Sequence, residues 1–209
     1  GVWKTVRSGF HYNYMSNVLN FNNGNGYFSD IAAYAGVSKT DWSWAPLIAD
    51  FDNDGIKDIF VTNGIKRELA NQDFGRFIND PQNDSIKDLP IVQVLDFLPS
   101  TKLQNYAFKN NGDLSFAKVI AEWGFEKELN SNGVAYADLD NDGDLDLVVN
   151  NLEDLAGIYR NNSTNNYINI KLVGDKKNIN AIGAKVKVFT DKSQQYQEMF
   201  LARGYQSSM

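Results

Sequence analysis

Residues 49–64 read ADFDNDGIKDIFVTNG, and residues 137–151 read ADLDNDGDLDLVVNN. Both stretches contain the nine-residue pattern D-x-D-x-D-G-x-x-D, which crowds aspartates into one short loop. Like charges about 4 Å apart repel by roughly 1 kcal/mol in water and more strongly near a protein surface. A folded loop of this kind therefore needs either a compensating cation or a catalytic use for its carboxylates.

The two acidic loops belong to a longer internal repeat. Residues 20–37 (NFNNGNGYFSDIAAYAGV) align with residues 108–125 (FKNNGDLSFAKVIAEWGF) at the offset of 88 that also relates the loops, and similarity at a fixed offset indicates a repeat architecture. The Asn-Gly pairs at 23–24 and 111–112, flanked by apolar residues, predict β-hairpins. The short apolar runs after the loops, at 59–61 and 147–149, favour strands that are buried on both faces.

Each repeat therefore predicts a strand, an aspartate loop, a second strand and an Asn-Gly hairpin. Four short antiparallel strands make one blade of a β-propeller, so the fold class is all-β, a partial propeller. Two short helices are expected on the propeller rim within an insertion in the first repeat, with Pro90 near the start of the second helix. The expected division is an N-terminal segment with the end of a preceding blade (1–33), a blade (34–125) with the insertion (64–101), a second blade (126–165) and a separate β module (166–209), in which Ile168, Ile170 and Leu172, then Val186 and Val188, alternate.

The loop pattern suits calcium, which takes 6–8 hard oxygen ligands at ~2.3–2.6 Å. Loop positions 1, 3, 5 and 9 would supply side chains, position 7 a backbone carbonyl, and Gly55 and Gly143 the turn. The pattern is not an EF-hand, because Val61 and Val149 stand where the bidentate Glu would be. Catalytic carboxylates are the weaker interpretation, because a bound cation lowers their pKa. The predicted metal residues are Asp50, Asp52, Asp54, Ile56, Asp58, Asp138, Asp140, Asp142, Asp144 and Asp146.

The composition limits the other classes of function. The net charge is −6, and nine of the 26 acidic residues lie in the two loops, so the acidity is mainly a metal-site signal. The chain has no cysteine, which excludes thiolate metal sites, thiol catalysis and disulfides. There is no basic stripe for nucleic acid and no apolar run near the ~18 residues of a membrane span. His11 is the only histidine and cannot build a zinc site or a catalytic triad by itself.

The loops, the hairpin motif and the tail of the chain resemble those of a known family. The loops, together with the N-G-x-x-F motif, resemble FG-GAP/VCBS repeat proteins, whose blades carry calcium loops like those of integrin α propellers. The tail YINIKLVGDKKNINAIGAKVKVF (167–189) and the stretch LARGYQSSM (201–209) look like the ASPIC/UnbV domain of cartilage acidic protein relatives. TDWSWAPLIADFDNDG (40–55) also looks like large surface-associated members in Bacteroidota. The resemblance implies two calcium ions, a cell-surface or secreted location associated with an outer membrane, and a fragment of a longer protein with a truncated ASPIC/UnbV domain.

The leading hypothesis is a calcium-stabilised module without enzymatic activity that presents a surface to a protein or glycan, for instance in an outer-membrane transporter complex. Trp42 and Trp44 align with Asn130 and Asn132, so the blade itself does not require them. They are expected either to pack on the inserted helices or to stack on a sugar or peptide. One alternative is a purely architectural subunit. Another is a polysaccharide-directed enzyme with carboxylates at the propeller mouth, for which the candidates are Asp113, Glu122, Glu126 and Glu128.

Overall fold

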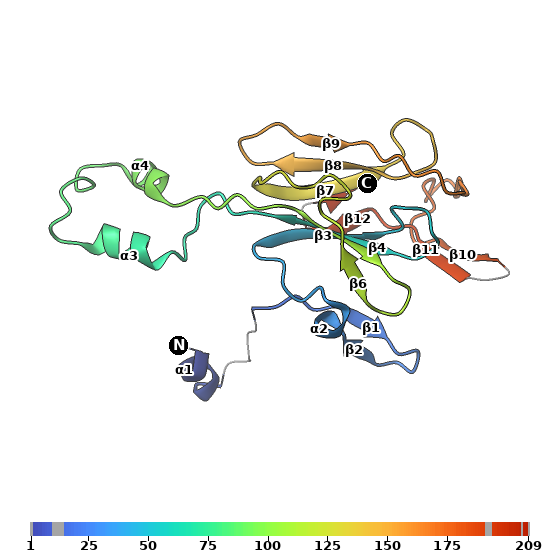
Figure 1. Ribbon diagram of the computed structural model, residues 1–209, viewed down its shortest axis with the longest axis horizontal. Helices are drawn as coiled ribbons and strands as arrows, with labels where there is room; N and C mark the ends of the chain where they lie inside the picture. The colour runs from blue at the N-terminus through green and yellow to red at the C-terminus, as the bar shows by residue number, and fades with distance from the viewer. Residues whose placement is uncertain (1, 10–14, 191–193, 206, 209) are drawn as a thin grey trace.

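The computed structural model describes residues 2–9, 15–190, 194–205 and 207–208, so His11 lies outside the described residues. The chain is mainly β, with several small antiparallel sheets and a few short helices (Figure 1). Two sheets carry the acidic loops and lie side by side at the centre of the molecule. The helices and the remaining hairpins surround them.

The first repeat forms the four-stranded antiparallel sheet that the sequence predicts. Its order is β3 (Ser43–Ala49), β4 (Asp58–Asn63), β5 (Tyr106–Asn110) and β6 (Phe116–Lys118). The register pairs Ala49 with Asp58 across the acidic loop and Asn110 with Phe116 across the hairpin. Every residue of β4 is buried, which confirms the expectation drawn from its short apolar run.

The second repeat forms three strands rather than the four expected. β7 (Ser131–Ala137), β8 (Asp146–Asn151) and β9 (Gly157–Tyr159) pair in that order. Leu147 pairs with Tyr159 as Ile59 pairs with Phe108, so β9 is the counterpart of β5. After β9 the chain does not make an Asn-Gly hairpin. It crosses to the first repeat instead, where the Ser163 Oγ donates to the Asp52 carbonyl at 2.9 Å.

An N-terminal hairpin repeats the last part of a blade. β1 (Asn20–Asn22) and β2 (Phe28–Asp30) pair through the predicted Asn-Gly turn, and Gly24 N–H donates to the Asn22 side chain at 2.9 Å. The β5–β6 turn repeats this contact between Gly112 and Asn110 at 2.9 Å. A short helix, α2 (Ala32–Ala35), follows β2 and ends at Gly36, whose φ of 80° is left-handed.

The main core lies between the two repeat sheets, and a smaller one lies on the other face of the first sheet. Phe60 is fully buried in the main core, and its ring centroid lies 4.7 Å from that of Phe125 in the connection between the repeats. The smaller core packs α2 against β4 and β5. The main core consists of Ala45, Leu47, Ala49, Phe51, Phe60, Ala107, Ile120, Phe125, Val134, Tyr136, Leu147 and Val149.

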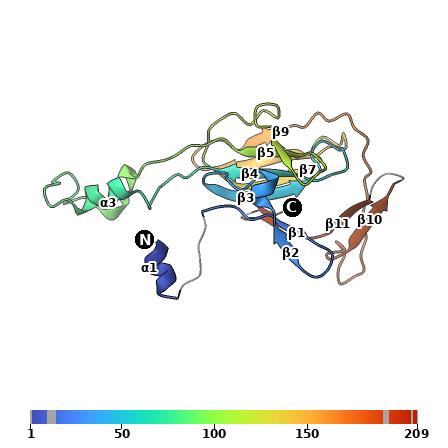
Figure 2. The ribbon, with the colours of Figure 1, turned by 60° about the horizontal axis from the view of Figure 1, so that its bottom comes forward.

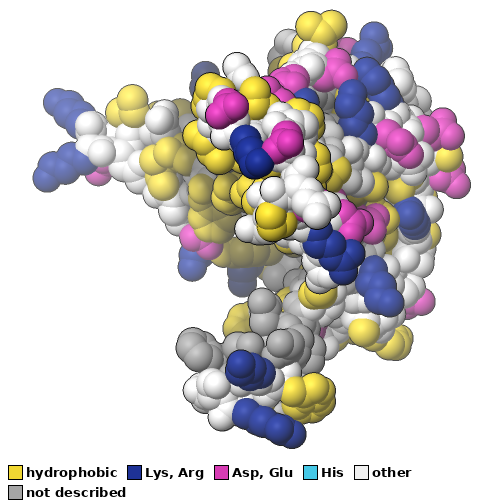
Figure 3. All heavy atoms as spheres, turned by 90° about the vertical axis from the view of Figure 1, so that its left-hand side faces the viewer, with side chains coloured by type: hydrophobic (Ala, Val, Ile, Leu, Met, Phe, Trp, Pro, Cys, Tyr) yellow, Lys and Arg dark blue, Asp and Glu magenta, His cyan; other side chains and the backbone are white. Residues whose placement is uncertain are grey.

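The insertion contains short helices as the sequence predicts, and the described sheets form no closed ring that would define a propeller rim. The insertion forms an arm that projects away from the sheets (Figures 1 and 2) and carries α3 (Gln72–Asn79), α4 (Ile91–Val94) and the 3₁₀ helix η1 (Leu95–Phe97). The first helix begins after Asn71, whose side chain accepts from Phe74 N–H at 2.9 Å, and Ile65 forms a β-bridge with Thr101. Hydrophobic side chains are visible at the surface on this side of the molecule (Figure 3), and those of the arm include Leu69, Ile78, Ile91, Val92 and Phe97.

The C-terminal part contains two more hairpins. β10 (Lys185–Phe189) pairs with β11 (Gln194–Glu198), and β12 (Ala202–Gly204) pairs with β13 (Ser207–Ser208). The alternation at 168–172 forms no strand, because no described strand pairs with it, and its isoleucines are exposed. β12 lies beside β3 and β7. A short N-terminal helix, α1 (Val2–Arg7), stands apart, and no described helix has the length and apolarity to cross a membrane.

Candidate metal centre

The two acidic loops have nearly the same backbone. Loop 1 (residues 50–58) joins β3 to β4, and loop 2 (residues 138–146) joins β7 to β8. In loop 1 the left-handed residues are Asn53 and Gly55, with φ of 57° and 95°. Their counterparts in loop 2 are Asn141 and Gly143, with φ of 61° and 94°. Asn and Gly are the residues that tolerate this conformation best, so the sequence pattern fixes the shape of both loops.

Each loop brings three carboxylates together at the spacing of a cation site. One oxygen each from Asp50, Asp52 and Asp54 lie within 4.8 Å of one another, and so do oxygens from Asp138, Asp140 and Asp146. Two oxygens bound to one calcium ion at ~2.6 Å each lie at most about 5.2 Å apart. The clusters therefore fit a hard divalent cation, and all six of their members are predicted side-chain ligands. The other two predicted side chains, Asp58 and Asp142, lie outside the clusters.

The aspartate at position 1 orders each loop by accepting backbone N–H groups. The Asp50 carboxylate accepts from Asp54 N–H at 3.1 Å and from Gly55 N–H at 2.9 Å. Asp138 accepts in the same way from Asp142 at 3.1 Å and Gly143 at 3.2 Å. Burial is the largest influence on Asp50 and raises the pKa of its carboxyl. A bound cation would offset that cost by favouring the ionised form.

The aspartate at position 9 joins the loop to the third strand of its sheet. Asp58 is buried, and its two oxygens accept from Phe51 N–H at 3.1 Å and Asn110 N–H at 2.9 Å. Asp146 accepts from Leu139 N–H at 2.9 Å and Asn161 N–H at 2.8 Å. Burial raises the pKa of Asp58 to about 6. Asp58 lies outside the carboxylate cluster of loop 1. Its observed role is to accept the two backbone hydrogen bonds that tie the loop to β5.

The residue at position 7 differs between the loops. The sequence assigns a backbone carbonyl there to Ile56 and Asp144, but it does not predict the placement of the Asp144 side chain. That side chain is 1% exposed, and its Oδ2 accepts from Ser163 N–H at 2.8 Å. Its Oδ1 has no hydrogen-bond partner among the described residues, and burial raises the pKa of the carboxyl to about 6. The Asp144 side chain is thus a buried carboxylate of loop 2 that lies outside the three clustered ones.

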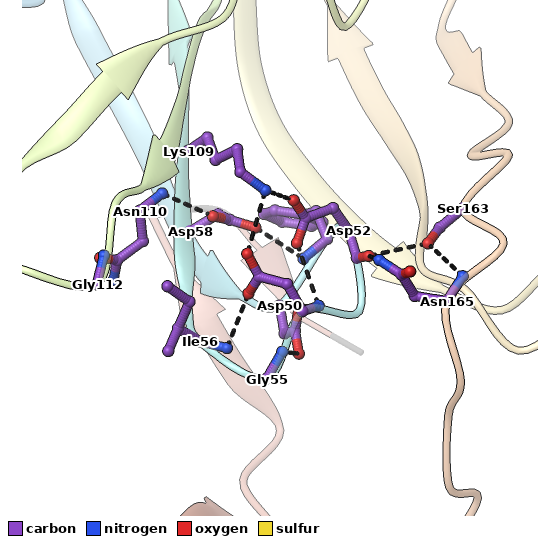
Figure 4. Close-up of polar contacts among 12 residues, drawn as sticks. Asp50, Asp52, Gly55, Ile56, Asp58, Lys109, Asn110, Gly112, Ser163 and Asn165 are labelled. Atoms are coloured by element: carbon purple, nitrogen blue, oxygen red, sulfur yellow. Dashed lines mark hydrogen bonds and ion pairs between the residues drawn. The ribbon is translucent and has the colours of Figure 1, made fainter. Parts of the chain in front are cut away.

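A basic side chain contacts the carboxylates of each loop. At loop 1 it is Lys109 of β5 (Figure 4), and at loop 2 it is Arg160, directly after β9. Lys109 Nζ contacts the Asp52 carboxylate and lies 3.1 Å from the Asp54 Oδ2. Its counterpart Arg160 places Nε 3.1 Å from the Asp140 Oδ2. Loop spacing alone could not find these residues. The shared signal is an aromatic residue, a basic residue and Asn at 108–110 and 159–161.

Trp42 and Trp44 lie in different surroundings. The Trp44 ring stacks on Tyr205 at 5.7 Å between centroids, and its Nε1 donates to the Gly64 carbonyl at 2.6 Å. This contact is with the C-terminal hairpin and not with the inserted helices. Trp42 is 40% exposed. A stacking role toward an external ligand therefore remains a prediction, and Trp42 is the more accessible of the two.

Of the four carboxylates considered for an enzyme, only Glu122 lines the cavity beside the connection between the repeats. This cavity of about 610 Å³ lies between the connection at 121–125 and residues 159–165, and Trp123 and Tyr159 contribute aromatic walls. Asp113, Glu126 and Glu128 do not line it. The Ser115 hydroxyl and N–H hold the pKa of Asp113 below its usual value, which favours the ionised carboxylate and so disfavours a role as general acid.

Comparison with known protein families matches most of the chain. The family described as FG-GAP-like repeat matches residues 8–61 and 83–149. The family described as ASPIC and UnbV matches residues 174–209. Both acidic loops lie within or at the edge of the repeat match, and the β10–β11 and β12–β13 hairpins lie within the second match. No curated protein matches the chain at a significant level.

Proposed function

Because the chain belongs to the FG-GAP-like repeat family and ends in an ASPIC and UnbV domain, we propose that it is a calcium-binding repeat module of a secreted or cell-surface protein. One observation carries the proposal. Two loops 88 residues apart adopt the same backbone conformation, and each brings three carboxylate oxygens within 4.8 Å of one another. Calcium would use carboxylates and carbonyls of these loops and neutralise charges that otherwise repel.

The proposed role of the metal is structural. Each loop connects the first two strands of its sheet. Its position-9 aspartate accepts a backbone N–H at the end of the third strand in loop 1 and directly after the third strand in loop 2. An ion in the loop would thus stabilise three strands of a sheet together. Loop 2 also lies close to the start of the C-terminal part, where a side chain at Gly143 would collide with the Tyr167 ring.

The proposed surface function is binding of a protein or glycan rather than catalysis. Among the described residues, the candidate acids outside the loops do not gather in the cavity that Trp123 and Tyr159 line. That cavity combines Trp123 and Tyr159 with polar side chains such as Arg160 and Asn162, a lining suited to recognition. The exposed apolar side chains of the arm offer a second surface. An outer-membrane partner complex belongs to the proposal through the family resemblance alone.

The proposed location follows from calcium availability. Extracellular calcium modules have dissociation constants of ~10⁻⁴–10⁻³ M. At millimolar calcium and a constant of ~0.1 mM, each site stabilises the fold by about 1.4 kcal/mol. At submicromolar calcium this contribution is close to zero, so the loops are useful mainly outside the cytoplasm.

Chelation tests the proposal. We expect EDTA to lower the melting temperature of the chain and millimolar calcium to restore it, while equal magnesium restores less because it demands a smaller octahedral shell. Calorimetric titration should show two calcium sites per chain. The Asp52→Ala, Asp140→Ala double variant removes one clustered carboxylate from each loop. It is the control and should melt at the same temperature with calcium or EDTA. A wild-type chain whose melting ignores both calcium and EDTA, and which binds no calcium by calorimetry, would contradict the proposal.

A further inference from the structure

We infer that the two calcium loops are unequal, and that Lys109 acts as a built-in competitor that weakens calcium binding at loop 1. The inference rests on the proposed calcium function and specifies its regulation. Loop 2 would fill first as calcium rises. Loop 1 would fill at higher calcium, when the ion displaces the Lys109 ammonium from the carboxylates.

The placement of the two basic side chains carries the first step. Lys109 Nζ lies against both Asp52 and Asp54, which are two of the three clustered carboxylates of loop 1. Arg160 contacts only Asp140 among the three of loop 2. A cation cannot use the carboxylate oxygens that an ammonium group occupies without moving that group. Calcium must therefore displace Lys109 from two ligands in loop 1 and Arg160 from one in loop 2.

The net charges of the two loops also favour stronger calcium binding at loop 2. Loop 1 has four aspartates and its own Lys57, and Lys109 reduces its net charge to −2. Loop 2 has five aspartates and no basic residue, and Arg160 leaves it at −4. The number of charged ligands is one of the two main determinants of calcium affinity in protein loops. Loop 2 is therefore the stronger site.

The buried Asp144 gives the third step. Its Oδ1 is enclosed and lacks a hydrogen-bond partner within the described part of the chain, whereas loop 1 has the apolar Ile56 at the same position. Asp144 lies outside the three clustered carboxylates of loop 2, but a cation in the same loop would reduce the cost of keeping its ionised carboxylate out of water. Loop 1 has no carboxylate at this position.

The weaker loop is also the one beside the C-terminal hairpin. The Lys57 Nζ in loop 1 donates to the Gln197 Oε1 of β11 at 3.1 Å. Lys109 precedes Asn110, whose N–H holds the buried Asp58. Calcium binding to loop 1 would therefore change the contacts of that loop with both the third strand and the ASPIC and UnbV hairpin, while loop 2 keeps its calcium ion.

The experiment measures calcium affinity loop by loop in the full 209-residue chain. The Asp138→Ala, Asp140→Ala variant disables loop 2 and isolates loop 1, and the Asp50→Ala, Asp52→Ala variant isolates loop 2. Calorimetric titration of each variant at low ionic strength should give a lower calcium dissociation constant for loop 2 than for loop 1. In the chain with loop 1 isolated, Lys109→Met should then raise the calcium affinity about tenfold, the order expected for removing one positive charge about 5 Å from a divalent ion.

A matched control separates displacement from a general charge effect. Lys118→Met removes the same charge from β6 of the same sheet, where Lys118 lies over the Tyr106 ring at 4.2 Å and away from the loop, and we expect less than a twofold change. Lys109→Gln repeats the test with a polar side chain, and circular dichroism checks the fold of each variant.

Three results would overturn the inference. One is an unchanged or weaker affinity in both Lys109 variants while calcium still binds, which leaves the proposed function intact. Another is a tighter constant for the isolated loop 1 than for loop 2. The last is the absence of calcium binding in either loop of the wild-type chain, which would remove the proposed function as well.

Discussion

The Asp58→Ala substitution should show that the last aspartate of each loop supports the fold even without calcium. Asp58 is fully buried, and its carboxylate accepts backbone N–H groups of Phe51 and Asn110 at 3.1 and 2.9 Å. A donor left without an acceptor costs ~1–3 kcal/mol when it is buried. Phe51 is buried and Asn110 is half-buried, so we expect a loss of about 2–4 kcal/mol in the free energy of unfolding, measured in EDTA.

The matched substitution is Asp54→Ala, five residues into the same loop. Asp54 is exposed, and apart from Lys109 it only accepts from Ile56 N–H at 3.0 Å within the loop. In EDTA this change should cost less than about 0.5 kcal/mol, as for other surface substitutions. In calcium it should abolish the stabilisation that the ion gives to loop 1. Loop 2 does not offer the same comparison, because its position-9 aspartate, Asp146, belongs to the carboxylate cluster and Asp142 does not.

Urea unfolding of both variants, with and without calcium, measures these differences from the shift of the midpoint at constant slope. The reasoning fails if Asp58→Ala costs no more than Asp54→Ala in EDTA. It also fails if Asp58→Ala loses stability only when calcium is present, because Asp58 would then act solely as a ligand.

Two further predictions concern pH and the C-terminal hairpin. Burial raises the folded-state pKa of Asp58 from 3.8 to about 6. Without calcium, protonation of Asp58 therefore stabilises the fold at low pH, and that stability is lost as the pH rises from about 4 through 6. The increase in melting temperature that calcium causes should accordingly be smaller at pH 5 than at pH 7, and an increase that does not depend on pH would contradict this. Trp44→Ala removes the stack on Tyr205 and should accelerate amide exchange at Val134, whose N–H donates to the Ser207 Oγ at 3.0 Å. The control Trp42→Ala should leave that exchange rate unchanged, and equal rates in the two variants would refute the coupling.

The sequence by itself determined the repeat and the local shape of the loops. Aspartates at alternate positions, with Asn and Gly where the backbone turns left-handed, are constraints that act within nine residues. The Asn-Gly hairpins and the buried strand at 59–61 are local in the same sense, since turn chemistry and short-range hydrophobic pattern specify them. The four-stranded sheet of the first repeat could therefore be predicted element by element.

The tertiary structure decided which groups meet across long separations. Lys109 reaches Asp52 from another strand, Ser163 reaches the buried Asp144 from the segment after β9, and Tyr205 covers Trp44. It also placed the inserted helices on a projecting arm and left the second sheet with three strands. Loop spacing carries no information on these contacts, because they depend on how the chain leaves each sheet and on which strand edges remain unpaired. The ligand pattern is thus local, whereas the charges that tune it come from side chains that only the folded chain brings together.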